Sequence, residues 1–241
     1  MAKERPTIEQ YKERFSKIEE KVAEAARKAG KSRDDIKIIA VSKTHPAEYI
    51  TDAMKAGLSV FGENYAQEMR DKHAYFEEQG LEHPEWHFIG HLQRNKVKYV
   101  APFIRMIHAV DSVRLARKID SEAEKSNRKI DILLQVNTSG EESKFGCDPG
   151  EIFNLAEEAL RFDNINIKGL MTICSFTNDG ITNKREFELL RKLKDEVNTK
   201  FSLDLKELSM GMTNDYELAV EEGATMVRIG TAIFGERDYS G

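Results

Sequence analysis

Eight short apolar runs, separated by stretches with helical patterning, constrain the fold of this chain more than any other feature. Most of the runs are nearly continuous, which is typical of parallel strands buried on both faces. Strict alternation of eight strands with helices predicts an α/β fold, a single (β/α)8 (TIM) barrel domain over residues 1–241. A doubly wound open sheet is the alternative, but it rarely needs eight consecutive parallel strands. The runs cover residues 36–43, 59–64, 86–93, 106–112, 131–137, 167–173, 206–211 and 226–235.

Helices are expected between the runs and also before the first of them. The leading helix is predicted from about residue 7 to 29, because Thr7 and Gln10 have capping-box spacing and Gly30 is a typical C-terminal stop. Its apolar residues recur every three or four positions, which predicts packing on the outside of the barrel. The other helices are expected at about 46–56, 64–79, 95–100, 112–127, 149–161 and 182–200, with one more beginning near Asn214.

Composition and charge exclude several classes of partner. A formal charge of −5 gives no electrostatic reason to expect a nucleic acid or an anionic membrane. The apolar runs are too short to span a bilayer, and the charged N-terminus has no apolar segment typical of a secretory signal. We therefore expect a cytoplasmic protein in which Cys147 and Cys174 are reduced, structural thiols.

Lys43 stands where the first predicted strand ends. Reactive groups in such barrels come from the C-terminal ends of strands and the loops after them. With a period of two, Ile39, Val41 and Lys43 share one face, which places the lysine at the barrel mouth. Partial desolvation there favours the neutral amine that forms a Schiff base. The alternative is a lysine that extends to solvent, and position alone does not decide between the two.

The segments after the seventh and eighth runs predict an anion site, because barrels often bind phosphate at this place. Backbone N–H groups and hydroxyls are available on both segments, and a glycine lets the backbone approach a phosphate closely. Thr213 has an alternative role as the cap of the helix that begins near Asn214. The residues predicted for this site are Ser209, Gly211, Met212, Thr213, Gly230 and Thr231.

Arg228 and Asn64 complete the predicted binding residues. Arg228 has the parity of Gly230 in the eighth run and is expected to point into the barrel, where it needs an acceptor. Either it forms a buried ion pair, for instance with Glu63, or it contacts the ring nitrogen of a cofactor. An arginine donates a hydrogen bond there without readily protonating the ring. Asn64 either bonds the 3′-hydroxyl side of such a ring or caps the following helix.

Other motifs give little further chemistry. His83, His87 and His91 are spaced by four, but Pro84 and the pattern around them favour a strand, in which they do not converge on one ion. We therefore expect no metal site. The remaining polar strand ends, at His91, Gln93, Asp111 and Asn137, carry no assigned role.

In these motifs the sequence closely resembles the YggS/PROSC family of pyridoxal phosphate homeostasis proteins, also called PLP-binding proteins. The resemblance runs over nearly the whole chain, and several specific motifs occur in the right order. They are AVSKTHP at 40–46, FGENYAQE at 61–68, WHFIGHLQRNK at 86–96, VDS at 110–112, QVNTSGEESKFG at 135–146, GLMTI at 169–173 and SMGMTNDYELAVEEGATMVRIGTAIFG at 209–235.

The resemblance implies a barrel similar to the N-terminal domain of alanine racemase, with pyridoxal 5′-phosphate (PLP) bound to Lys43 as a Schiff base. It also implies that the SMGM and RIGT segments hold the phosphate and that Arg228 approaches the ring nitrogen. Two departures are small. Thr213 stands where the family commonly has serine, and Cys174 and Ser175 stand where a proline is frequent.

The expected function is that of a non-enzymatic carrier. A racemase of this fold type needs a second acid/base group on the opposite ring face, supplied by another domain, and about six residues follow the eighth run here. We expect a monomer that buffers PLP and delivers it to PLP-dependent apoenzymes, with effects on amino-acid and keto-acid pools, and we assign no catalytic residue. The alternatives are a PLP-dependent amino-acid racemase-like enzyme and a protein that sequesters partner enzymes without the cofactor.

Overall fold

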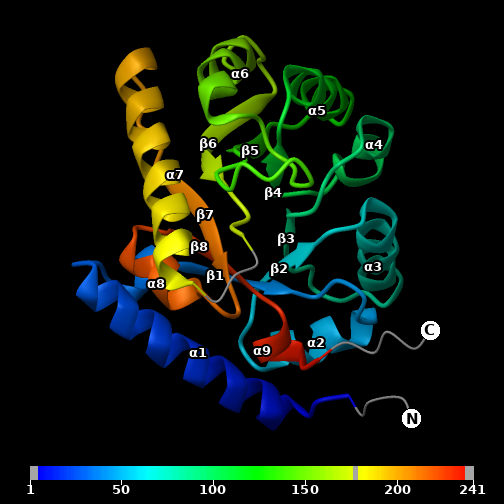
Figure 1. The fold of residues 1–241 in the computed structure, drawn as a ribbon. Helices are drawn as coiled ribbons and strands as arrows, with labels where there is room; N and C mark the ends of the chain where they lie inside the picture. The colour runs from blue at the N-terminus through cyan, green and yellow to red at the C-terminus, as the bar shows by residue number, and fades with distance from the viewer. Residues whose placement is uncertain (1–4, 176–178, 237–241) are drawn as a thin grey trace.

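The computed structural model describes residues 5–175 and 179–236 and contains a closed barrel with the strand order β1 to β8. Every neighbouring pair is parallel, and β8 closes the barrel onto β1 with Ile38 opposite Val227. The predicted (β/α)8 barrel is therefore confirmed, and an open sheet is excluded (Figure 1). The strands are β1 (Lys37–Val41), β2 (Val60–Glu63), β3 (Glu85–Phe88), β4 (Met106–Val110), β5 (Ile130–Gln135), β6 (Ile165–Met171), β7 (Glu207–Met212) and β8 (Met226–Ile229).

Helices surround the strands, and the predicted leading helix lies across the outside of the barrel (Figure 1). This helix, α1 (Ile8–Lys28), has the predicted capping box between Thr7 and Gln10 and packs against α2, α8 and α9. No helix in the described ranges is both long and apolar enough for a bilayer crossing. The other helices are α2 (Ala47–Lys55), α3 (Ala66–Glu78), α4 (Val97–Val100), α5 (Val113–Lys125), α6 (Ile152–Ala159), α7 (Gly180–Phe201), α8 (Tyr216–Glu221) and α9 (Thr231–Phe234), with 3-10 turns at Arg33–Asp35, Arg94–Lys96 and Pro149–Glu151.

Alternation along the strands separates two apolar layers. Ile38 and Ala40 belong to the large core between the strands and the helices, whereas Ile39 belongs to a small cluster inside the barrel. This is the alternation predicted for the first strand. The buried members of the interior cluster are Ile39, Val60, Met106, Leu133, Met171 and Met226.

Six strands are shorter than the predicted runs, and β3 and β8 differ from them the most. β3 ends at Phe88, and β8 ends at Ile229, after which residues 231–234 form α9 instead of continuing the strand. Ile233 and Phe234 are buried, and the Phe234 ring meets Tyr11 of α1 edge to face at 5.8 Å. Because a short apolar run fits either a strand or one buried helical turn, periodicity did not separate the two.

Candidate functional site

A cavity of about 690 Å³ opens at the C-terminal ends of β1, β2, β7 and β8. This is the end of a (β/α)8 barrel at which binding sites are built, and the volume is typical of a small-molecule site. Apolar contacts come from Val41, Ile89 and Ile173. The predicted residues that line the cavity are Lys43, Asn64, Met212, Thr213, Arg228, Gly230 and Thr231.

Lys43 lies half-buried in the turn after β1, and hydrogen bonds on both sides hold this turn. Before it, Ser42 Oγ donates to Glu63 Oε1 at 2.6 Å. After it, the Thr44 N–H donates to Glu68 Oε1 at 2.6 Å. Thr44 has a φ of +68°, a strained conformation for a residue with a branched side chain. Such strain persists only where the surroundings impose it, so the backbone of the turn that carries Lys43 is fixed by its neighbours.

A buried ion pair between Lys72 and Glu63 also holds this turn. Lys72 Nζ lies 2.6 Å from Glu63 Oε1 and 2.7 Å from Glu68 Oε1, and it also donates to the Ser42 carbonyl at 2.8 Å. Burial raises the pKa of Glu63 to about 7, while Lys72 acts in the opposite direction. The suggested ion pair between Arg228 and Glu63 is therefore wrong, because Lys72 is the partner of that carboxylate. The sequence signal for Lys72 is its spacing of four from Glu68 on α3.

Arg228 points into the barrel as predicted, and two hydrogen bonds fix its guanidinium. Nη1 donates to Ser209 Oγ at 2.7 Å, and Nη2 donates to the Thr172 carbonyl at 2.8 Å. Burial lowers the pKa of Arg228 to about 10, so the side chain is still a cation at neutral pH. A guanidinium held in this way presents only donors to whatever occupies the cavity.

Behind Arg228 a chain of hydrogen bonds crosses the interior of the barrel. Ser209 Oγ is 2.9 Å from His108 Nδ1, and His108 Nε2 is 2.8 Å from His87 Nδ1. His87 Nε2 is 2.8 Å from Glu85 Oε1, which also accepts from Lys37 Nζ at 2.6 Å. Burial lowers the pKa of both histidines, and the hydrogen bond from His87 lowers the pKa of Glu85 to about 2.

The ionised carboxylate of Glu85, which can only accept hydrogen bonds, sets the direction of the chain. The ionised Glu85 accepts from His87 Nε2–H, so the neutral His87 presents Nδ1 as an acceptor to His108 Nε2–H. His108 Nδ1 is then an acceptor for the Ser209 hydroxyl, whose oxygen accepts from Arg228. No local sequence pattern predicts this chain, because its members lie on five different strands.

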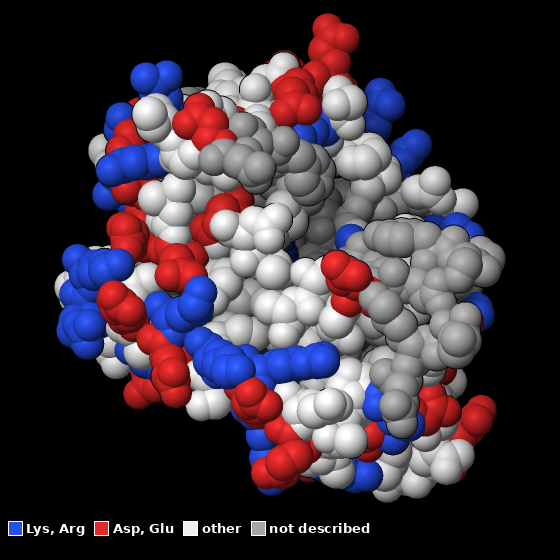
Figure 2. Space-filling view, turned by 60° about the horizontal axis from the view of Figure 1, so that its bottom comes forward, with Lys and Arg blue, Asp and Glu red and all other residues white. Residues whose placement is uncertain are grey.

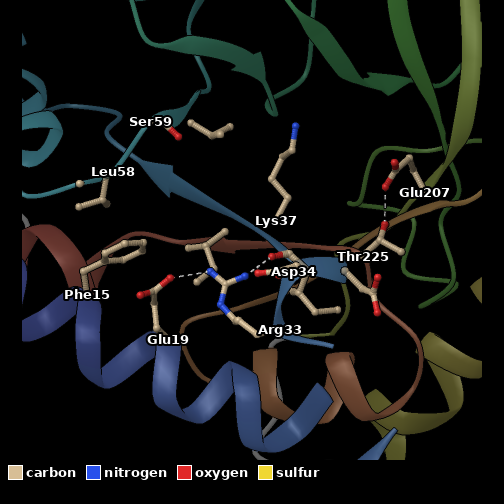
Figure 3. Close-up of a pocket in the computed structure, with 14 residues that line it drawn as sticks. Phe15, Glu19, Arg33, Asp34, Lys37, Leu58, Ser59, Glu207 and Thr225 are labelled. Carbon is tan, nitrogen blue, oxygen red and sulfur yellow. Dashed lines mark hydrogen bonds and ion pairs between the residues drawn. The ribbon is translucent and has the colours of Figure 1, made fainter. Parts of the chain in front are cut away.

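The other end of the chain reaches a second cavity, of about 450 Å³, at the N-terminal ends of the strands. Lys37 is one of the residues that line it, together with Glu19, Arg33 and Glu207 (Figure 3). Arg33 from the 3-10 turn reaches Glu19 of α1 at 2.9 Å, and Thr225 Oγ1 donates to Glu207 at 2.6 Å. The buried chain thus runs from solvent at this end to Arg228 in the cavity that Lys43 lines. That first cavity is called the upper cavity below.

The two predicted phosphate segments meet at the edge of the upper cavity. The Gly230 N–H donates to Thr213 Oγ1 at 3.4 Å, and the Thr231 hydroxyl lies 3.3 Å from the same oxygen. The Met212 N–H is bonded to Asp215 Oδ1 at 2.6 Å. The suggested capping role of Thr213 is wrong, because α8 begins at Tyr216 and its N-cap is Asp215. Thr213 instead links the two segments.

Comparison with known proteins decides the relationship of this chain. The family model described as "Alanine racemase, N-terminal domain" matches residues 14–238. A protein of Aquifex aeolicus (strain VF5), named pyridoxal phosphate homeostasis protein, is 42% identical over 227 residues, which are 94% of this chain and 98% of that relative. The chain belongs to the family of pyridoxal phosphate homeostasis proteins. The resemblance noted in its motifs is confirmed.

Solved structures agree with this family assignment. PipY of Synechococcus elongatus PCC7942, solved with PLP bound, is similar with a TM-score of 0.82 and 32% identity, covering 93% of this chain and all 100% of that one. An alanine racemase of Clostridium difficile 630, solved in complex with cycloserine, has a TM-score of 0.67 at 14% identity, which shows a shared fold alone. That match covers 86% of this chain and 56% of the racemase.

Two residues predicted for this family's site lie outside the cavity lining. Ser209 is fully buried within β7, and its hydroxyl belongs to the internal chain. Gly211 has a φ of +90°, and a Cβ added there would lie 2.5 Å from the Ala219 Cβ of α8, so this glycine serves helix packing. The Ser209 side chain therefore does not supply the predicted phosphate contact. Contacts through the backbone N–H groups of Ser209 and Gly211 stay predictions.

Asn64 borders the cavity, and it does not cap α3, whose N-cap is Tyr65. A glycine that the sequence analysis did not single out makes room for it. A Cβ added at Gly90 would lie 2.6 Å from Asn64 Cα and from its carbonyl oxygen. The approach of the β2 and β3 strand ends therefore depends on this glycine in the WHFIGH motif.

The spaced histidines do not come together. His87 is buried in the internal chain, whereas His91 stacks on Phe145 with ring centroids 3.9 Å apart. Both cysteines are buried free thiols, and burial raises the pKa of Cys147 to about 12.

On the face of the molecule seen in Figure 2, acidic and basic side chains are interspersed around a hollowed, largely uncharged middle.

Proposed function

We propose that this chain binds PLP in the upper cavity, as a Schiff base on Lys43, and acts in PLP homeostasis. The observation that carries the proposal is the convergence of three kinds of group on one cavity. These are the Lys43 amine, the fixed Arg228 guanidinium, and the linked segments around Thr213 and Gly230. The similarity to PipY, a protein solved with PLP bound, supports the same ligand.

The donor set fits the chemical groups of this cofactor. An aldehyde needs a primary amine, which Lys43 supplies. A phosphate needs N–H and hydroxyl donors, which are present on Thr213, Gly230 and Thr231. A pyridine nitrogen needs a single hydrogen-bond donor, and Arg228 offers one in a fixed position. The residues present therefore fit the cofactor.

When bound, the cofactor would supply an aldehyde that condenses with amines and a ring that withdraws electrons. The residues around it limit that second property. Arg228 has a pKa of about 10 and is held by Ser209 and Thr172, so it donates a hydrogen bond and retains its proton. A ring whose nitrogen stays unprotonated is a weaker electron sink. The site is thus suited to holding the cofactor more than to carbanion chemistry.

We therefore propose a carrier that buffers PLP and passes it to apoenzymes in the cytoplasm, without turnover of its own. The name pyridoxal phosphate homeostasis protein, which relatives at about 40% identity carry, supports this role. The recipient enzymes and the monomeric state stay predictions. A racemase-like activity is the second candidate, because the barrel shares its fold with alanine racemase.

The test is to trap the cofactor on the protein. The purified chain is mixed with PLP, its absorbance is recorded, and borohydride reduction is followed by peptide mass spectrometry. We expect the adduct on Lys43, its loss in Lys43→Ala, and its retention in Lys98→Ala, which removes an exposed lysine of α4. An adduct on another lysine, or none, would contradict the site.

Activity separates the carrier from the alternatives. The chain loaded with PLP is incubated with L-alanine and other amino acids, and the D-isomers are measured. Turnover that Lys43→Ala abolishes would contradict a carrier without catalysis. A cellular effect that survives Lys43→Ala would instead favour sequestration of partner enzymes without the cofactor.

A further inference from the structure

A second cluster of polar side chains lies on the outside of the barrel, away from the cavity that holds Lys43. His73 and Glu77 are one turn apart on α3, and His83 lies between α3 and β3. One nitrogen or oxygen atom from each of the three lies within 4.8 Å of the other two. Because His83 precedes β3, the cluster is at the N-terminal ends of the strands, opposite the end that carries Lys43.

The end of α3 brings His83 back onto the helix. Gly80 has a φ of +61°, and its N–H donates to the Glu77 carbonyl at 3.1 Å. The Leu81 N–H donates to the Phe76 carbonyl at 2.9 Å, which completes a Schellman turn. This turn reverses the chain, and the His83 ring comes to rest 5.9 Å from the ring of Phe76. The approach of His83 to α3 is thus built into the backbone.

The ring of His73 is held before any ligand arrives. It stacks on Phe103 with centroids 3.8 Å apart and an interplanar angle of 7°, and the His83 ring lies 4.4 Å from it. His73 Nε2 is 3.5 Å from Glu77 Oε1, whereas His73 Nδ1 is buried with no hydrogen-bond partner within the described residues.

We propose that His73, Glu77 and His83 form a binding site for a divalent transition-metal ion such as Zn²⁺. Two imidazole nitrogens and one carboxylate oxygen are a ligand set that Zn²⁺, Co²⁺ and Ni²⁺ prefer, whereas Mg²⁺ and Ca²⁺ prefer oxygen ligands alone. The exposed side chains of Glu77 and His83 rotate toward the fixed His73 ring to complete the set, and water fills the remaining positions. The ion cross-links α3 to the segment before β3.

This site does not depend on the histidine spacing in the sequence. His83, His87 and His91 repeat every four residues, but His87 is inside the barrel and His91 stacks on Phe145. The partner of His83 is His73, ten residues earlier on a different element. Both cysteines are buried with raised pKa values, so they do not compete for the metal.

The experiment uses the full chain without a polyhistidine tag, stripped with a chelator and then titrated with Co²⁺ and Zn²⁺. We expect one equivalent of Co²⁺ to bind with visible absorption bands that Zn²⁺ abolishes by competition. His83→Ala and Glu77→Gln change exposed side chains, so they keep the fold, and each is expected to weaken binding at least tenfold. His91→Ala is the matched control and is expected to bind as the unaltered chain does.

Thermal unfolding gives a second measurement. Zn²⁺ is expected to raise the Tm of the unaltered chain and of His91→Ala, but not that of His83→Ala. Absence of stoichiometric Co²⁺ binding to the unaltered chain would overturn the proposal. Equal affinity in His83→Ala and in the unaltered chain would overturn it as well. Because PLP is not needed, neither result depends on the function proposed for the upper cavity.

Discussion

At the scale of single residues, the guanidinium of Arg228 takes its position from groups that do not line the cavity. Its two acceptors are the hydroxyl of Ser209 and the carbonyl of Thr172, and the Ser209 hydroxyl is in turn bonded to His108. A buried polar group that loses its partner keeps the full cost of its desolvation. The serine therefore carries more of the local stability than its size suggests.

Ser209→Ala is expected to lower the free energy of unfolding by about 1–3 kcal/mol, because it leaves Arg228 Nη1 and His108 Nδ1 without their shared partner. Urea unfolding measures the change. Ser16→Ala, which removes an exposed hydroxyl from α1, is the control and is expected to stay within about 0.5 kcal/mol of the unaltered chain. Equal losses in the two variants would contradict the role of Ser209.

The buried histidines predict a pH dependence of stability. Burial lowers the pKa of His87 and His108 in the folded chain, whereas both regain an ordinary value, about 6.5, on unfolding. Below that pH the unfolded chain binds protons that the folded chain does not, so stability is lost as the pH falls. Each histidine contributes at most about 1.4 kcal/mol per pH unit.

Replacing His108 by Gln removes one of the two imidazoles that take up a proton when the chain unfolds at low pH. His108→Gln is expected to be less stable than the unaltered chain at pH 7.5 but to lose less stability between pH 7.5 and 5.5. Urea unfolding at the two pH values gives the comparison, with His91→Gln as the control on an exposed ring. An unchanged pH dependence in His108→Gln would contradict a lowered pKa of His108 in the folded chain.

At the scale of elements, the sequence placed most helices and strands within a few residues, because apolar runs and capping signals are local. The end of the eighth run is the instructive exception. β8 ends at Ile229, and Thr231–Phe234 form α9, whose Phe234 ring meets Tyr11 of α1. A contact with a helix more than two hundred residues earlier decided the conformation, and no local pattern carries that information.

Packing of β7 on α8 predicts the effect of Gly211→Ala. Gly211 has a φ of +90°, and the new Cβ would meet Ala219 at 2.5 Å, so α8 must shift. Gly57→Ala is the matched control, because Gly57 also has a positive φ, +106°, but has nothing within 4 Å of an added Cβ. Urea unfolding is expected to show a further loss of about 1–3 kcal/mol in Gly211→Ala, from overpacking alone. Equal destabilisation of the two variants would show that only backbone strain matters.

At the scale of the whole molecule, barrel closure explains what the sequence could and could not predict. Strand order and the strand-end rule were enough to bring Lys43, Arg228 and Thr213 to one cavity. The internal chain behind Arg228 was out of reach, since it depends on how far each strand is staggered against its neighbour. Register shifts in the β4–β5 and β7–β8 pairs change which side chains meet inside the barrel.

Closure of the barrel also predicts how cofactor binding changes hydrogen exchange of amides far from the cavity. Each strand is bonded on both sides, so complete opening of one strand requires opening of the whole ring. A cofactor that binds only the folded chain, at about 100 times its Kd, adds about 2.7 kcal/mol to the free energy of unfolding, which slows globally limited exchange about 100-fold. We expect this protection in the slowest amides of β5, which lies across the barrel from β1. Hydrogen exchange with mass spectrometry, with and without PLP, measures it, and Lys43→Ala is expected to lose most of the effect. Protection confined to the loops after β1, β7 and β8 would show instead that the barrel opens in parts.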